Sequence, residues 1–262
     1  MSDLRAAVDA LRWYHTIDLG DGVVTPGLYD TPAECAHVPL PASLEGRRCL
    51  DIGTADGFWA FEMERRGAAE VVALDIDDPD DYDWPAHRDA SEVERFRRDH
   101  PNHRAAFELA GRALGSRVTR TAGRVYDLDP DSHGSFDFVF MGSLLLHLRD
   151  PVGALMAVRR VTGGQLLSVD SISPMLTIMH PRQPVARFEA PGWPLWWVMN
   201  LAAYRSLFPA AGFSAIEAGR PFRVATNQGY EAKPRSRRPL YGVLQRAAAR
   251  RGIPHAWVLA RP

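Results

Sequence analysis

Short runs of consecutive hydrophobic residues alternate with segments of helical hydrophobic spacing through most of this chain. The runs predict seven strands, over residues 48–52, 70–76, 118–125, 136–141, 165–170, 213–218 and 255–260. The helical spacing predicts helices over residues 4–14, 58–66, 92–98, 103–114, 150–162 and 201–211. Glycine follows several of these helices, and Gly163-Gly164 is expected to end the fifth.

Strands that alternate with helices over more than a hundred residues predict an α/β fold, a doubly wound and mostly parallel sheet. No regular helix is expected between the last two strands, which predicts an antiparallel edge strand and a seven-stranded sheet. The chain of 262 residues, 46% of them hydrophobic, can bury one substantial core. We expect an N-terminal helix and lid segment (1–45) and one core domain (46–262). Within that domain we expect an insertion (171–200) and a basic C-terminal segment (218–262).

A glycine loop follows the first strand, with the sequence Asp51-Ile52-Gly53-Thr54-Ala55-Asp56-Gly57. Such a loop at the start of a helix is typical of a nucleotide site, because free N–H groups meet the ligand there. The dinucleotide fingerprint requires glycine at positions 53, 55 and 58, and this chain has Ala55 and Phe58. The remaining pattern is Asp51-x-Gly53-x-x-x-Gly57, with Asp75 at the end of the second strand.

This loop and the strands that follow it, to about residue 170, resemble the class I S-adenosylmethionine-dependent methyltransferases, whose sheet is Rossmann-like. The resemblance implies an enzyme that uses S-adenosyl-L-methionine. It implies cofactor contacts from Asp51, Gly53, Thr54, Gly57, Asp75, Ile76, Tyr126, Asp127 and Met141. Asp75 would bind the ribose hydroxyls, and Tyr126-Asp127 the adenine amino group. Ala55 replaces a glycine that is frequent in the family.

Two residues near the predicted ends of strands four and five are candidates for catalysis. Methyl transfer depends mainly on alignment of donor and acceptor, so many such enzymes need no base. His147 has the chemistry of a general base, or alternatively packs beside Asp150 at a helix start. Asp170 either contacts the substrate or caps the turn to Ser171.

The insertion at 171–200 combines many aromatic residues with five prolines and has no single periodicity. This composition predicts a pocket wall above strands four and five, or alternatively a small separate core under a long loop. The candidates for substrate binding are Tyr14, His15, His180, Trp193, Trp196 and Trp197. Tyr82 and Trp84, after the second strand, are expected near the adenosine or as a closure of the site.

Charge is distributed unevenly along the chain. Residues 1–217 carry 21 Lys and Arg against 31 Asp and Glu, whereas residues 218–262 carry 10 against one. The stretch from Tyr14 to Gly27 and the stretch from Asp56 to Glu62 resemble a bacterial group described as tRNA wobble-uridine (5-methoxyuridine-type) methyltransferases. An RNA-binding protein generally needs a broad basic surface, and this body is acidic.

We therefore expect a small, apolar or aromatic acceptor molecule, as in specialised metabolism. The alternative is a tRNA methyltransferase that binds through the basic residues of the tail. These are Lys233, Arg235, Arg237, Arg238, Arg246, Arg250 and Arg251. A third hypothesis is a protein that binds the cofactor without catalysing methyl transfer.

Other classes of protein receive no support from the sequence. The N-terminus has no signal pattern and no apolar run reaches about 18 residues, so a cytoplasmic protein without a membrane span is expected. Cys35 and Cys49 form no ligand cluster with histidine, so no metal site is expected. Nothing in the sequence indicates an oligomeric state.

Overall fold

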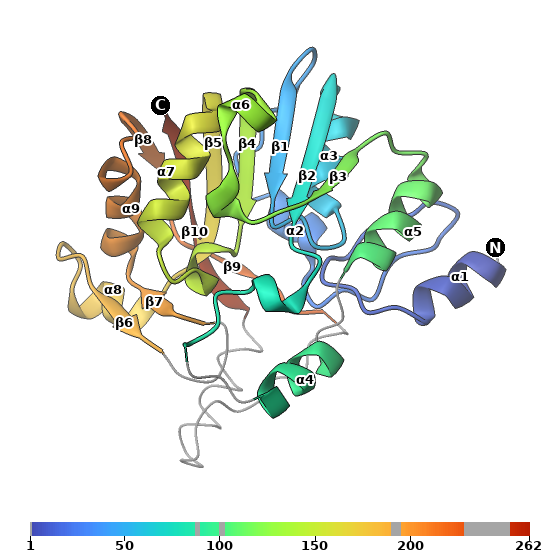
Figure 1. The fold of residues 1–262 in the computed structure, drawn as a ribbon, viewed down its shortest axis with the longest axis horizontal. Coiled ribbons are helices and arrows are strands. Elements are labelled where there is room, and N and C mark those ends of the chain that lie inside the picture. Colours follow the sequence, from blue (N-terminus) through green and yellow to red (C-terminus); the bar gives the residue numbers. More distant parts are fainter. Residues whose placement is uncertain (1, 87–89, 100–102, 190–194, 228–251) are drawn as a thin grey trace.

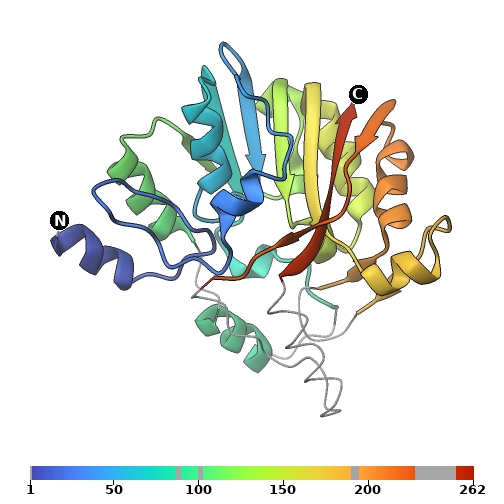
Figure 2. The same ribbon diagram turned by 180° about the vertical axis from the view of Figure 1, so that it is seen from behind.

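One large mixed sheet forms the centre of the protein (Figures 1 and 2). The computed structural model describes residues 2–86, 90–99, 103–189, 195–227 and 252–262. The strand order is β3-β2-β1-β4-β5-β10-β8, and β9 pairs with β10 outside this row. The strands are β1 (Arg48–Ile52), β2 (Glu70–Asp75), β3 (Thr119–Ala122), β4 (Phe136–Gly142), β5 (Thr162–Ser171), β8 (Ala215–Ala218), β9 (Phe222–Val224) and β10 (Ile253–Arg261).

Strand direction agrees with the sequence prediction. β1, β2, β3, β4 and β5 are parallel to one another, and β10 is antiparallel to β5, β8 and β9. The prediction of a doubly wound, mostly parallel sheet with an antiparallel pair at one side is confirmed. The three-residue β9 was not predicted, because so short a strand leaves no alternation to recognise.

The helices cover both faces of the sheet. Figure 1 shows α7 in front of the strands and α3 behind them. The helices are α1 (Ser2–Asp9), α2 (Thr31–Cys35), α3 (Phe58–Arg65), α4 (Ala90–Asp99), α5 (Arg104–Leu114), α6 (Pro130–His133), α7 (Pro151–Val161), α8 (Pro174–Met179) and α9 (Leu201–Ala210). Three 3-10 turns are η1 (Pro79–Asp81), η2 (Val125–Asp127) and η3 (Leu145–His147).

Alternation along β4 shows how the sheet separates two hydrophobic cores. Val139 and Met141 pack into the core beneath α7 and α9. Phe138 and Phe140 face the other core, beneath α3, α5 and the N-terminal segment. Because parallel strands are covered on both faces, they are hydrophobic throughout, and this is why their positions were predictable.

Two predicted boundaries were wrong, each for a physical reason. The first helix ends at Asp9 rather than at residue 14, and the buried Trp13 donates its indole N–H to the carbonyl of Val8 (2.9 Å). Gly163 and Gly164 lie within β5 rather than ending α7. A Cβ on Gly164 would lie 2.2 Å from the carbonyl oxygen of Asp137 on the adjacent strand, so glycine serves strand packing there.

The segment between β5 and α9 has secondary structure that the sequence did not predict. It contains α8 and an antiparallel pair, β6 (Ala186–Phe188) with β7 (Trp197–Met199). No helix in the described part of the chain is long and apolar enough to cross a membrane.

Asn200 fixes this segment against the first turn of α9. Its amide oxygen accepts from the backbone N–H groups of Ala203 (2.7 Å) and Val185 (3.1 Å). Its amide nitrogen donates to the carbonyls of His180 (2.8 Å) and Gln183 (2.9 Å). The side chain is fully buried, so all four bonds replace water.

Asn200→Ala is therefore expected to reduce the free energy of unfolding by about 3 kcal/mol, since it removes a helix cap and leaves buried polar groups unpaired. Chemical denaturation measures this change. Ser206→Ala, which removes an exposed hydroxyl from the same helix, is the control and should change stability by less than about 0.5 kcal/mol. Equal stability of the two variants would contradict the role of Asn200.

Candidate functional site

The loop between β1 and α3 is closed onto β2 by backbone hydrogen bonds. The N–H groups of Gly53 (2.8 Å) and Thr54 (3.3 Å) both donate to the carbonyl of Leu74. Asp51 is buried beneath the loop and accepts from the hydroxyl of Thr54 (2.6 Å). Burial raises the pKa of Asp51 to about 7. Asp51 and Thr54 therefore shape the loop from below.

Three residues of this loop have positive φ angles: Gly53 (75°), Ala55 (50°) and Gly57 (97°). A Cβ on Gly57 would lie 2.5 Å from Phe61 and 2.7 Å from Phe107, so the helices pack directly against this residue. Ala55 occupies the left-handed region without being glycine, which costs about 1 kcal/mol. The departure from the family pattern at this position therefore strains the backbone.

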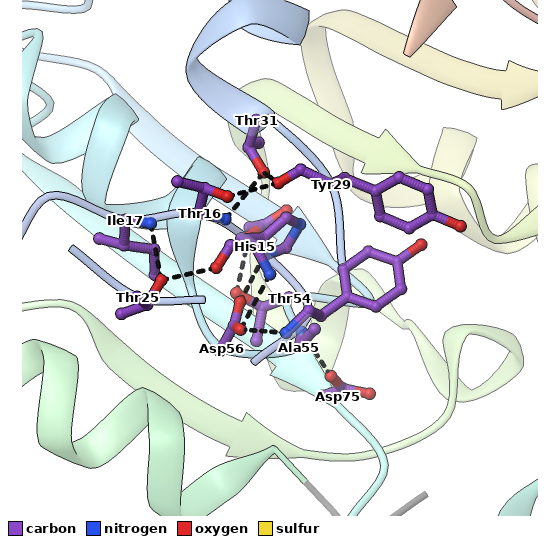
Figure 3. Close-up of polar contacts among 12 residues, drawn as sticks. His15, Thr16, Ile17, Thr25, Tyr29, Thr31, Thr54, Ala55, Asp56 and Asp75 are labelled. Carbon is purple, nitrogen blue, oxygen red and sulfur yellow. Dashed lines mark hydrogen bonds and ion pairs between the residues drawn. The ribbon is translucent and has the colours of Figure 1, made fainter. Parts of the chain in front are cut away.

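Asp75, at the end of β2, lies directly beside the loop (Figure 3). One carboxylate oxygen accepts from the N–H of Ala55 (2.7 Å) and the other from the N–H of Ile76 (2.8 Å). Burial raises the pKa of Asp75. Each oxygen retains a lone pair, so the carboxylate can still accept from two vicinal hydroxyls. By contrast, Asp77 is bound by Arg104 (2.7 Å) and Arg120 (2.5 Å).

A hollow opens beside Asp75. It is lined by Asp75, Ile76, Asp77, Asp78, Pro79, Tyr82 and His103. The buried Nδ1 of His103 has no hydrogen-bond partner among the described residues. The hollow combines apolar and aromatic side chains, an unpaired ring nitrogen and three carboxylates, of which Asp77 is paired with arginines. Tyr82, Ile76 and the free lone pairs of Asp75 are groups that could hold the adenosine part of S-adenosylmethionine.

The N-terminal segment is attached to the glycine loop through one buried carboxylate (Figure 3). Asp56 accepts from the backbone N–H groups of Tyr14 (2.6 Å) and His15 (3.0 Å), and it pairs with Nδ1 of His15. Burial alone would lower the pKa of His15, but the Asp56 carboxylate raises it overall. Burial opposes ionisation of Asp56, yet His15 keeps its pKa below the usual value. The sequence predicted His15 as a substrate contact; the structure uses its Nδ1 to hold Asp56.

The predicted adenine contacts, Tyr126 and Asp127, lie in η2 after β3. The hydroxyl of Tyr126 donates to the buried Asp83 (2.6 Å), which also binds Arg124 (2.9 Å) and the N–H of Arg149 (2.7 Å). Tyr126 is therefore already engaged in a polar network, whereas Asp127 is exposed.

The two catalytic candidates have different surroundings. Asp170 is buried, and its carboxylate accepts from the N–H groups of Leu145 (2.8 Å) and Ser171 (2.7 Å). Burial raises the pKa of Asp170 to about 7. It thus caps the loop after β4. His147 is half-buried in η3, and Met141 lies inside the core.

The substrate candidates of the later segment are not gathered in one place. The backbone N–H of Trp196 donates to Leu146 (2.8 Å) in η3, and its indole N–H donates to the carbonyl of Asp83 (2.7 Å). Trp197 donates to the carbonyl of Arg149 (3.4 Å). His180 follows α8, which lies at the opposite side of the molecule from α1 in both ribbon views. Trp193 lies outside the described residues.

Several polar residues around Tyr14 were not predicted from the sequence. Glu34 is buried near Tyr14 and His15, and burial raises its pKa to about 7. Ser143 follows β4, and His255 enters from β10 with Nε2 at 3.2 Å from the Ser143 hydroxyl oxygen. Nothing in the local pattern connects residues so distant in sequence. The positive φ of Ser143 (48°) is visible only in three dimensions.

Comparison with known proteins agrees with this geometry. Residues 29–218 match a family model described as a methyltransferase domain. The fold and the site define an S-adenosylmethionine-dependent methyltransferase. The chain belongs to that methyltransferase domain family.

Among curated proteins, the chain is similar to the tRNA U34 carboxymethyltransferases of Pseudomonas savastanoi pv. phaseolicola and Pseudomonas syringae pv. syringae. Identity is 24% over 177 residues, which is 66% of this chain and 47% of each relative. The chain thus spans about half the length of these curated relatives. Among solved structures, the N-terminal domain of EvdMO1 with S-adenosylhomocysteine bound is similar over 99% of this chain and 95% of that domain, with a TM-score of 0.61 and 17% identity.

Gly57→Ala is expected to destabilise the protein by about 2 kcal/mol or more, because the new methyl group meets two aromatic rings at a positive φ. The matched variant Ala55→Gly relieves strain in the same loop and should be neutral or stabilising, by up to about 1 kcal/mol. Thermal unfolding of the two variants and the unmodified protein measures both effects. A stable Gly57→Ala variant would show that the loop can reach another conformation.

The ion pair of His15 and Asp56 predicts a pH-dependent stability. The lowered pKa of Asp56 stabilises the fold above its unfolded value of about 3.9, and this contribution is lost as pH falls through the folded pKa. The raised pKa of His15 stabilises the fold below its unfolded value of about 6.5, and this contribution is lost as pH rises through the folded pKa. The contribution of the pair is therefore largest between about pH 4 and 6.5.

Asp56→Asn should cost about 3 kcal/mol in that range, and the difference from the unmodified protein should shrink at higher pH. Denaturation between pH 5 and 9 measures this change, with the exposed Asp9→Asn as the control. A difference that does not vary with pH would contradict the loss of the His15 charge in this range.

Proposed function

We propose that this enzyme transfers a methyl group from S-adenosylmethionine to a small molecule with an apolar or aromatic body. The observation that carries the proposal is that two segments cover the carboxyl edge of the sheet, the edge where β1, β2, β4 and β5 end. Ligands bind at this edge in doubly wound folds. In Figure 1 it is the lower edge of the sheet.

The two covering segments are fastened to different parts of the site. Residues 13–31 are held on the glycine loop by Asp56. The described parts of the later segment, residues 172–189 and 195–199, are held at two places. Trp196 binds Leu146 in the loop after β4 and the carbonyl of Asp83, and Asn200 binds the backbone of His180, Gln183 and Val185 at the start of α9. A covered site admits a small acceptor more readily than the anticodon loop of a folded RNA.

The residues that would bind the methyl donor lie between β1 and the segment that follows β2. S-adenosylmethionine supplies an electrophilic methyl group when it is bound. Asp75 would hold the ribose, Tyr82 and Ile76 would wall the adenine, and the loop at Gly53–Gly57 would accommodate the methionine part. Alignment of two bound reactants alone lowers a barrier by about 7–11 kcal/mol in favourable cases.

Aromatic side chains on the later segment support an acceptor with an apolar or aromatic body. Phe188 lies 5.8 Å from Trp196 and 5.4 Å from Trp197 between ring centroids. Both indole N–H groups are engaged by backbone carbonyls, so the rings offer apolar surface.

The second candidate is methylation of tRNA, which the names of the curated relatives favour. Under that hypothesis the basic residues between positions 233 and 251 would bind the RNA. They lie outside the described residues. Residues 1–217 carry more acidic than basic side chains, so this part of the chain does not extend the basic segment. A cofactor-binding protein without turnover is the third candidate.

We expect S-adenosylhomocysteine to accumulate when the enzyme and S-adenosylmethionine are incubated with a panel of small aromatic molecules, but not with unmodified tRNA. The variant with Arg235, Arg237 and Arg238 all changed to Ala should retain this activity. Salt-dependent tRNA binding that this variant loses would instead support the RNA hypothesis. No turnover with any acceptor, despite tight binding of S-adenosylhomocysteine, would support the third candidate.

The role of Asp75 in binding the methyl donor is tested by calorimetric titration with S-adenosylhomocysteine. Asp75→Ala should weaken binding by about 10–100-fold for each ribose hydrogen bond that is lost, because one hydrogen bond to a charged group is worth about 1.5–3 kcal/mol. Asp80→Asn, an exposed change in the segment that follows β2, should bind normally.

A further inference from the structure

The hollow beside Asp75 offers few polar groups that a ligand can still use. Of its carboxylates, Asp77 is paired with Arg104 (2.7 Å) and Asp78 with Arg97 (3.5 Å). Asp75 accepts from two backbone N–H groups, so each of its oxygens retains a lone pair. Asp75 can therefore accept hydrogens from a ligand that enters the hollow.

His103 brings a second polar group to the same hollow. Its side chain is part of the lining, and its buried Nδ1 has no hydrogen-bond partner among the described residues. A buried polar atom without a partner is unfavourable, and such atoms are rare in folded proteins. An atom of this kind beside a hollow is explained when a ligand supplies the missing partner.

The position of His103 gives no structural reason for a histidine. It is the N-cap of α5, where Ser, Thr, Asp and Asn are preferred because their side chains cap the helix. The imidazole makes no such bond, and only the backbone carbonyl of His103 takes part in the helix, by accepting from the N–H of Phe107 (2.8 Å). The ring instead packs edge-on against Tyr14, with 6.1 Å between the ring centroids. The ring is thus held beside the hollow without use of Nδ1.

We propose that His103 binds the methyl donor. Its Nδ1 donates a hydrogen bond to a ribose hydroxyl oxygen of S-adenosylmethionine, while Asp75 accepts from the hydroxyl hydrogens. This inference rests on the proposed function, in which Asp75 holds the ribose, and it adds a residue from outside the glycine-loop pattern. Nδ1 lies beneath the surface of the hollow, so binding includes a turn of the ring that brings this atom to the ligand.

The hydrogens of this arrangement determine the form of the histidine. The two ribose hydroxyls carry one hydrogen each, and the two oxygens of Asp75 can accept both. The ribose oxygens then have only lone pairs to offer, so a ring nitrogen that binds one of them must carry a hydrogen. A neutral imidazole can have its one N–H at Nδ1. Donor binding therefore requires the form of His103 with hydrogen on Nδ1.

Calorimetric titration of two variants tests this hydrogen bond. His103→Ala removes the ring, and His103→Phe keeps an aromatic ring beside Tyr14 but removes both nitrogens. Each should weaken binding of S-adenosylhomocysteine about three- to tenfold, as expected for the loss of one hydrogen bond. Without ligand, both should melt within a few degrees of the unmodified protein, because Nδ1 has no partner to lose. The control is His133→Ala, which changes a histidine at the end of α6 and at the opposite edge of the sheet (Figure 1), and it should bind normally.

Ligands that lack one hydroxyl separate a direct hydrogen bond from an indirect effect. The probes are the 2′-deoxy and 3′-deoxy forms of S-adenosylhomocysteine. For at least one of them, His103→Ala should weaken binding less than about twofold, since the hydroxyl that His103 contacts is already missing. If His103→Ala weakens binding of all three ligands by the same factor, or of none of them, the inference is overturned.

Nitrogen-15 NMR of the His103 ring is the second measurement. The signal of Nδ1 should shift when S-adenosylhomocysteine is added, and Nδ1 should carry a hydrogen in the complex. An Nδ1 without hydrogen in the complex would overturn the inference. Failure of S-adenosylhomocysteine to bind the unmodified protein would instead overturn the proposed function.

Discussion

The site depends on one buried carboxylate, Asp56, and on the partners that stabilise its charge away from water. An unpaired buried charge is strongly unfavourable, so Asp56 needs partners. It obtains three, the N–H groups of Tyr14 and His15 and the ring of His15. These partners belong to the segment that precedes β1. The glycine loop is therefore complete only when this segment lies on it, and the same bonds place Tyr14 beside the loop.

Two other acids at the carboxyl edge, the half-buried Asp75 and the buried Asp170, follow a related rule, with backbone N–H groups in place of a histidine. Asp75 joins the glycine loop to β2, and Asp170 joins the loop after β4 to β5. Each carboxylate accepts hydrogen bonds from backbone N–H groups of a loop, and these N–H groups would otherwise lack partners. Desolvation raises the pKa of both carboxylates, so their protonation is sensitive to any charge brought into the site.

The sequence predicted the parts of the fold that depend on local patterns. β1, β2, β4 and β5 are hydrophobic runs covered on both faces, and the start of α7 is marked by Asp150 and Pro151. The glycine loop and Asp75 could be recognised from spacing. His103 and Asp83 could not, since their roles depend on how loops from different strands meet.

The contact between Ser143 and His255 was the least predictable part of the site, for a topological reason. Ser143 and His255 are 112 positions apart and meet only because β10 returns antiparallel beside β5. The composition of the segment at 171–200 suggested a pocket wall, but it did not reveal Asn200 as the residue that holds it. Likewise, the sequence shows only that Ala55 replaces a glycine, and the backbone angle shows the strain.

The two halves of the site thus come from different parts of the chain. The donor half is built from one continuous stretch, from β1 to the hollow after β2. Under the proposed function, the acceptor half would be assembled from both ends of the chain. The N–H of Asp30 donates to Ala225 (3.0 Å), the N–H of Asn227 donates to Leu28 (2.8 Å), and β10 brings His255 beside Ser143. Changes at the ends of the chain would then alter which molecule is methylated while the donor half keeps its geometry. This separation explains how one methyltransferase fold serves many acceptors, because the donor is bound by the centre of the sheet and the acceptor by what is folded over its edge.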